Sequence, residues 1–353
     1  MTTKTISKRK RDVKSNARSR LNKEKQSSTT VILDSLSREF DNATLPQWWD
    51  IHYQNMPHYL YHYTTGAGLI GIFESNKIWA SNVLYMNDRS EILHGLQLAS
   101  TIVGEKQQQA SLPETRDFLN GVEAILDPAK WLFDFYVACF CAKDDVLSQW
   151  RGYAGMGNGY ALAVFPEELE HGSGNGIAPN IGLRKVIYDE QEQIEIINVA
   201  VDKGCELLEK ESTKARVEKL ALAYRIQRKL FDRLLECVVC FKHKSFQEEE
   251  EWRMIHKLRS VNDEEWRNEN KLTPTDQDIT PLKFRDAGGR IVPYIALDFS
   301  SSNKPNIGRL PIEAVRHGPA VIPELAKKSL FLLSQKYGYK GLMVEGSDVP
   351  LRP

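Results

Sequence analysis

Short runs in which apolar and polar side chains alternate, or in which nearly every side chain is apolar, recur along this chain and predict β-strands. Residues 59–64 read Tyr-Leu-Tyr-His-Tyr-Thr and alternate, whereas residues 134–141 are almost entirely apolar, which is typical of a central strand. Further strands are predicted at 77–82, 160–165, 182–188, 249–258, 290–298, 311–317 and 341–345. The dominant element of the fold is therefore expected to be a sheet.

Apolar residues three or four positions apart predict helices between these strands. Helices are expected directly after Asp88 and at 67–76, 112–126, 144–153 and 322–337. Two longer amphipathic segments form a helical hairpin within residues 190–241, and this hairpin looks like an insertion into a sheet protein. We therefore predict an α+β architecture with flanking helices, in which residues 57–353 form a single domain.

Charge is distributed unevenly, although the chain as a whole has a net charge of zero. Residues 1–30 hold ten of the 47 basic residues but only two of the 47 acidic ones, which leaves 37 basic and 45 acidic residues in the remainder. This arm has few apolar residues, so we predict that it is disordered. It is either a contact for phosphate or nucleic acid or a solubilising tail. Residues 31–56 are interpreted as a lead-in segment.

Cysteine usage and hydropathy favour a cytoplasmic protein. Five cysteines form no disulfide framework, which fits a reducing compartment, and Cys237 and Cys240 are predicted to be buried thiols because they lie in an apolar helical run. The chain has no apolar run of about 18 residues, so no membrane partner is expected. No secretory signal is apparent, and no metal-binding or phosphate-loop motif is found.

The most unusual stretch contains four consecutive carboxylates, Glu248 to Glu251. Such close like charges repel, so we expect Lys242, Lys244 and Arg253, or water, to relieve them. If a strand begins at residue 249, Glu249, Glu251 and Arg253 share one face of it. The stretch is then either a reactive site or a solvated loop that leads into an edge strand.

Two other polar positions also allow a functional and a purely structural interpretation. His62 lies in an aromatic strand, where it is either satisfied by a backbone carbonyl or a fixed hydrogen-bond donor to a ligand hydroxyl. Gln149, Trp150, Arg151 and Tyr153 precede flexible glycines. They suit stacking on a nucleobase and pairing with a phosphate, or they simply pack against the sheet.

In combination, several motifs resemble the DUF2971 family, whose name declares its function unknown. The resemblance covers about residues 57–353 and excludes the basic arm. It is carried by Leu60-Tyr61-His62-Tyr63-Thr64, Ile78-Trp79-Ala80, Tyr85-x-Asn87-Asp88, Leu147-Ser148-Gln149-Trp150-Arg151-Gly152-Tyr153, Glu249-x-Glu251-Trp252-Arg253 and Ser347-x-x-Pro350-x-Arg352.

A His-x-Thr strand followed much later by a Glu-x-Glu strand also resembles the ADP-ribosyltransferase superfamily. This resemblance implies a split mixed or antiparallel sheet, NAD as the substrate, and a toxin-like or defence role in prokaryotes. His62 and Thr64 would then hold a ribose hydroxyl, and Glu251 would face the nicotinamide ribose beside Glu249. Tyr85 and Tyr153 both fit the position that flanks the nicotinamide, and Arg151 or Arg253 would hold the pyrophosphate.

The hypothesis that follows is NAD-consuming glycosyl transfer, either to an unknown acceptor or to water, through an oxocarbenium-like transition state. The alternative is a non-enzymatic module that binds or senses a nucleotide or RNA, with the basic arm as a contact for nucleic acid. A third hypothesis is a metal-dependent nuclease that uses Glu249, Glu251 and Asp88.

Overall fold

The computed structural model describes residues 35–44, 55–86, 89–126, 135–171, 182–210, 216–258, 282–299 and 308–350. The predicted arm 1–30, Asn87 and Asp88 lie outside these residues, and the lead-in segment 31–56 is described only as a helix at 35–44 and at its last two residues. Contacts between residues divide the chain into two compact units, which are described separately below.

The first unit is helical and takes its residues from segments 1–46, 100–126 and 195–234. It contains the helix at 35–44, α5 (Pro113–Ile125), and parts of α4 (Arg89–Gln109), α9 (Glu190–Lys210) and α10 (Arg216–Val238). Phe40, Val103, Phe118, Val122 and Leu230 are among its buried apolar residues. The two long helices expected within residues 190–241 are α9 and α10, while their being an insertion into a single domain over 57–353 stays a prediction.

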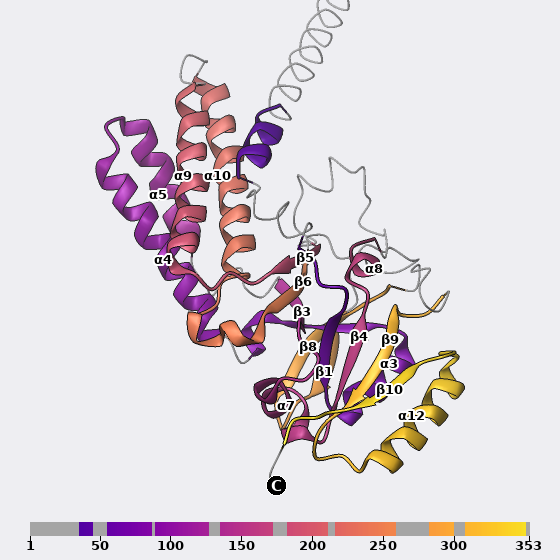
Figure 1. Cartoon of the computed structure of the whole chain (residues 1–353). Helices are drawn as coiled ribbons and strands as arrows, with labels where there is room; N and C mark the ends of the chain where they lie inside the picture. The colour runs from indigo at the N-terminus through magenta and orange to yellow at the C-terminus, as the bar shows by residue number, and fades with distance from the viewer. Residues whose placement is uncertain are drawn as a thin grey trace, which may run out of the picture. The chain divides into compact units, whose positions relative to one another are not determined.

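The second unit contains a mixed sheet, and Figure 1 labels most of its strands. Its path runs β10-β9-β4-β1-β3-β2-β8-β7, and β6 pairs with β3 and β5. The strands β9 and β10 are parallel, and the other paired strands are antiparallel. The bounds are β1 Leu60–Thr64, β2 Ile78–Asn82, β3 Phe135–Cys141, β4 Tyr160–Val164, β5 Gly182–Lys185, β6 Glu251–Lys257, β7 Lys283–Asp286, β8 Ile291–Leu297, β9 Ile312–His317 and β10 Met343–Gly346.

These elements confirm the predicted α+β class with a mixed sheet. The strand β7 was missed, because its four residues are all exposed and leave no apolar pattern. The predicted strand at 249–258 begins two residues late, because Glu250 has a left-handed backbone (φ 40°) that ends the 3₁₀-helix η4 (Lys244–Glu249).

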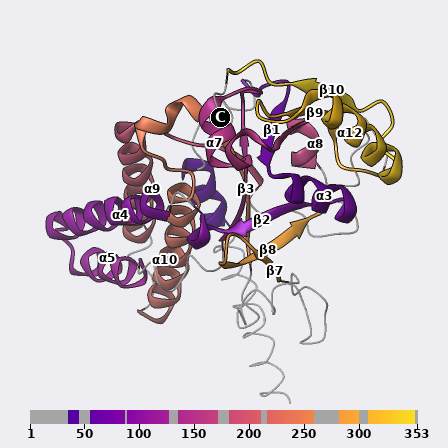
Figure 2. The ribbon, with the colours of Figure 1, turned by 90° about the horizontal axis from the view of Figure 1, so that it is seen from below.

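Different helices pack on the two faces of this sheet. Helices α3 (Gly66–Ser75) and α12 (Pro323–Tyr337) contribute Ile72 and Leu330 to the core that contains Leu60, Phe140 and Trp252 of the strands (Figures 1 and 2). On the other face, Trp150 of the short helix α7 (Leu147–Gly152) packs with Tyr63, Cys141 and Ala161. The alternation of strand side chains produces these two separate cores.

The sheet is split at β3. The strand β6 pairs with β3 along its whole length. The opposite edge is shared: β2 pairs with Val137 and Tyr136, whereas β1 pairs with Cys141. Between these two contacts, no strand in the described part of the chain pairs with the edge of β3 around Cys139. The sheet therefore opens where β1 and β2 diverge.

Helix α7 is held in place by the carboxylate of Asp145. Its Oδ1 accepts hydrogen bonds from Trp150 Nε1 (2.6 Å) and Ser347 Oγ (2.5 Å), and its Oδ2 accepts one from the backbone N–H of Asp348 (2.7 Å). Val349 then packs against the core that contains Trp150. One carboxylate thus ties the C-terminal segment to the helix.

We predict that Asp145→Ala lowers the free energy of unfolding by about 2–3 kcal/mol, because it leaves the buried Trp150 indole N–H without its acceptor. Urea unfolding measures this change. The matched control is Asp144→Ala, whose carboxylate is 45% exposed and pairs with Arg316, and it should cost less than about 1 kcal/mol. Equal losses in both variants would contradict the role assigned to Asp145.

Candidate functional site

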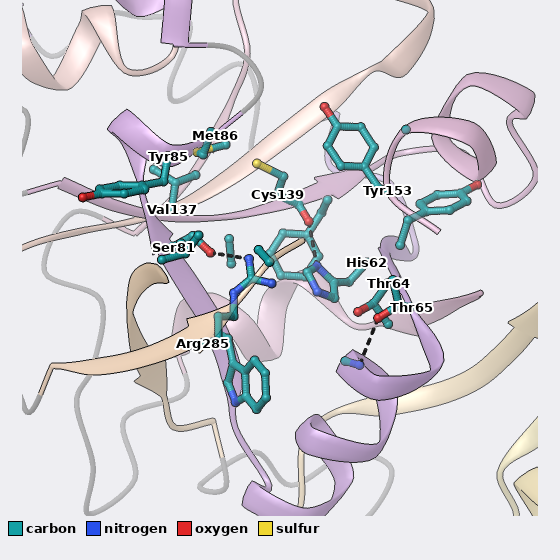
Figure 3. Close-up of a pocket in the computed structure, with 18 of the residues that line it drawn as sticks. His62, Thr64, Thr65, Ser81, Tyr85, Met86, Val137, Cys139, Tyr153 and Arg285 are labelled. Atoms are coloured by element: carbon teal, nitrogen blue, oxygen red, sulfur yellow. Dashed lines mark hydrogen bonds between the residues drawn. The ribbon is translucent and has the colours of Figure 1, made fainter. Parts of the chain in front are cut away.

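A cavity of about 460 Å³ lies at the split of the sheet, within the size range of small-molecule sites (Figure 3). It is lined by β1, β2, β3, the first turn of α3, α7, the end of η4 with the start of β6, and the β7–β8 hairpin. Its polar lining includes most of the predicted site residues, namely His62, Thr64, Tyr85, Tyr153, Glu249 and Glu251.

His62 bridges the gap in the sheet. Its Nδ1 lies 2.8 Å from the carbonyl oxygen of Cys139, and Nδ1–H must be the donor because a carbonyl only accepts (Figure 3). The imidazole thus bonds a backbone carbonyl of β3 at the point where none of the described strands pairs with this edge. This bond confirms the interpretation in which a backbone carbonyl satisfies His62. The remaining nitrogen, Nε2, is then an acceptor in the neutral ring, so a contact with a ligand hydroxyl would use His62 as the acceptor and not as the donor.

The environment keeps this imidazole neutral. Burial lowers the pKa of His62 below its usual 6.5, the Cys139 carbonyl opposes that shift, and the positive charge of Arg285 adds to it. A neutral ring at pH 7 keeps Nε2 available to accept a hydrogen bond.

Thr64 reaches the cavity because the neighbouring helix begins with glycines. Thr65 caps α3 by accepting a hydrogen bond from the N–H of Gly68 (3.2 Å). A Cβ atom at Gly68 would lie 2.1 Å from the Thr64 hydroxyl, so only glycine leaves room for that group. The His-x-Thr strand and the first turn of the helix therefore form one continuous polar wall.

The two carboxylates of the site are joined through buried cations. Lys242 Nζ donates to Glu249 Oε2 (2.7 Å) and Glu251 Oε2 (3.0 Å). Arg253 binds both oxygens of Glu251, through Nε to Oε1 (2.8 Å) and through Nη2 to Oε2 (3.0 Å). Glu249 ends η4 instead of sharing the strand face with Glu251 and Arg253, so that prediction was wrong, but Lys242 still brings the carboxylates together.

These contacts keep Glu251 ionised. Burial opposes ionisation, but the charges of Arg253 and Lys242, together with hydrogen bonds, outweigh it and lower the pKa of Glu251 to about 2. Burial also raises the pKa of the Cys141 thiol to about 12, so the thiol stays protonated and donates to the carbonyl oxygen of Glu249 (2.8 Å). The carboxylate end of the cavity is therefore fixed on several sides.

The arginines expected to hold a pyrophosphate are placed elsewhere. Arg253 is fully buried and also donates to the carbonyl of Val239 (2.6 Å), and neither Arg253 nor the exposed Arg151 lines the cavity. Instead, Arg285 and Arg290 of the β7–β8 hairpin line it. Arg285 Nη2 donates to Ser81 Oγ (2.9 Å), and burial lowers its pKa (Figure 3).

Sequence reasoning missed these two arginines, although a recognisable pattern marks them. They flank Asp286-Ala287-Gly288-Gly289, and both glycines have positive φ angles, as a tight hairpin turn requires. Tyr85 and Tyr153 both line the cavity from different elements, so the choice between them stays open (Figure 3).

Among the described residues, no group of three or more His, Cys, Asp or Glu side chains is arranged to hold a metal ion. The proposed nuclease residue Asp88 lies outside the described part of the chain. None of the described helices combines the length and the apolar character needed to cross a membrane.

The fold and the site define an α+β protein with a cavity at the split of a mixed sheet. Residues 149–254 match the model of the family described as "Protein of unknown function (DUF2971)", which supports that resemblance. The matched stretch runs from α7 through the paired carboxylates to β6. No curated protein and no solved structure matches the chain.

We predict that Arg253→Met lowers the free energy of unfolding at pH 7 by about 3–5 kcal/mol, because it removes the strongest partner of a buried carboxylate. The depressed pKa of Glu251 stabilises the fold above about pH 4.5, and this contribution is lost as pH falls toward 2. The variant should therefore lose less stability on acidification than the wild type. Denaturant unfolding across this pH range tests both effects, with the exposed Arg151→Met as the control.

Proposed function

We propose that this protein cleaves the N-glycosidic bond of NAD and transfers the ADP-ribosyl group to an acceptor or to water. The observation that carries the proposal is that one cavity holds both His62, with its Nε2 acceptor, and the ionised Glu251 beside Glu249. These groups match the requirements of a reaction that builds positive charge on a sugar.

The chemistry assigns a separate role to each group. When the bond between ribose and nicotinamide breaks, its electrons leave with the base and an oxocarbenium-like centre forms, which a nearby fixed carboxylate stabilises. Glu251 supplies that charge, while Lys242 and Arg253 are positioning residues. Glu249 accepts the proton of the attacking hydroxyl or water. The Nε2 atom of His62 accepts a hydrogen bond from a ribose hydroxyl.

The charge distribution of the cavity supports a ligand with a pyrophosphate. Glu251 is paired with Cys141 at one end of β3, whereas Arg285 bonds Ser81, which is paired with Val137. These positions on β3 are roughly 13 Å apart at about 3.3 Å per residue. A dinucleotide would thus place its ribose near the carboxylates and its phosphates near Arg285 and Arg290.

A second candidate function is nucleotide binding without catalysis. The observation that favours it is that both oxygens of Glu251 already accept hydrogen bonds from Arg253 or Lys242. A site of this kind would recognise the ligand without breaking it. Turnover measurements separate the two functions.

We predict that the purified protein releases nicotinamide from NAD and that Glu251→Gln slows this release at least about 100-fold, because the reaction loses the charge that stabilises its transition state. Chromatography of free nicotinamide gives the rate. Glu248→Gln, at the exposed first position of the carboxylate run, should retain the wild-type rate. Binding of NAD without release, even with cell extract as a source of acceptors, would favour the second candidate.

We also predict that NAD binding weakens on acidification below pH 6.5, as His62 gains a proton at its lowered pKa and Nε2 changes from acceptor to donor. Above that pH, binding should be constant. His62→Ala should weaken binding about tenfold at pH 7.5 and remove this acid limb. Calorimetry on the Glu251→Gln background, where NAD is not consumed, measures the profile, and an unchanged acid limb in His62→Ala would contradict the assignment.

A further inference from the structure

Gln149 is a buried polar residue whose side chain has no hydrogen-bond partner among the residues that the structure describes. It lies in the first turn of α7, is only 7% exposed and lines the cavity. Its backbone carbonyl accepts a hydrogen bond from Tyr153 (3.0 Å), but its side-chain amide makes no hydrogen bond to any residue that the structure describes. Buried amides nearly always have hydrogen-bond partners, so an unpaired one in a cavity wall points to a ligand.

The neighbours of Gln149 place it at the carboxylate end of the cavity. Trp150, the next residue, packs in the same core as Cys141. The thiol of Cys141 donates to the backbone carbonyl oxygen of Glu249, and Cys141 is paired with Glu251 in the sheet. Under the proposed function, the carboxylates face the ribose that loses its base. We therefore place the amide of Gln149 near the leaving base, at the Cys141 end of β3, whereas Arg285 lies by Val137.

We propose that Gln149 is a specificity-determining residue that recognises the carboxamide of the leaving nicotinamide. This inference rests on the proposed function and names the group that the site reads. A carboxamide offers one carbonyl acceptor and one NH₂ donor, and the Gln149 amide offers the same pair, so two antiparallel N–H···O bonds can form. The ring of Tyr153, which lines the cavity just after α7, provides a surface for stacking the base.

The rigidity of the helix supports this recognition. Trp150 is fully buried, and its indole N–H is fixed on Asp145, so the turn that carries Gln149 is anchored one residue away. An amide held at the cavity wall by an anchored helix discriminates between bases, because a base without the matching group cannot form both of these hydrogen bonds.

The test compares NAD with its 3-acetylpyridine analogue, in which a methyl group replaces the amide nitrogen. Affinities are measured by calorimetry on the Glu251→Gln protein, so that neither ligand is consumed. With Gln149 present, NAD should bind about 10- to 100-fold more tightly than the analogue. Adding Gln149→Leu should weaken NAD by about the same factor and leave the analogue within about threefold, which removes the preference.

A matched control comes from the adjacent residue. Ser148 Oγ is buried without a hydrogen-bond partner among the described residues, but Ser148 does not line the cavity, so Ser148→Ala should leave both affinities unchanged. The comparison of NAD with the analogue on the protein that retains Gln149 needs no variant at this position, so it can overturn the role of Gln149 even if Gln149→Leu fails to fold. Equal binding of NAD and the analogue by that protein would overturn the role of Gln149 and leave the proposed function standing. Absence of binding to either ligand would instead overturn the proposed function.

Discussion

The constraint on which this structure depends is that the backbone groups of β3 need hydrogen-bond partners where its edge passes from β2 to β1. A buried backbone carbonyl needs a hydrogen-bond donor, and at Cys139 the imidazole Nδ1–H of His62 donates to it. Because a side chain replaces a strand there, the sheet opens without leaving an unsatisfied group. The hydrogen bond fixes the orientation of His62 at this opening, and both His62 and Cys139 line the cavity there.

The opening also explains how His62 and Glu251 come to line one cavity. His62 lies on the same face of β1 as Leu60, which packs in the core with α3 and α12. Glu251 pairs with Cys141, whose side chain packs on the other face with Trp150 of α7. In a continuous sheet, side chains on these two faces do not meet. The split at β3 removes the barrier between the faces, so one cavity is lined by both groups.

Alternation and helical spacing were sufficient to predict most strands and helices, because burial on one face leaves a periodic pattern. They failed where local geometry breaks the pattern. The left-handed Glu250 delays β6 and moves Glu249 onto a 3₁₀-helix, and the polar strand β7 has no apolar face to read. Partner choice was predicted in part: Lys242 and Arg253 were expected to relieve the run of carboxylates, and they do. Arg253 was also expected to be able to hold a phosphate, and the spacing did not show that its bonds to Glu251 keep it out of the cavity.

The run of four carboxylates shows how charge is divided at the site. Glu248 is exposed, Glu250 pairs with Lys143, and only Glu249 and Glu251 turn inward, where Lys242 and Arg253 balance them. The formal charges of this buried quartet cancel, which offsets part of the cost of burying them. Lys242 donates to both carboxylates and so links Glu249 at the end of η4 to Glu251 at the start of β6, which fixes both carboxylates at one end of the cavity.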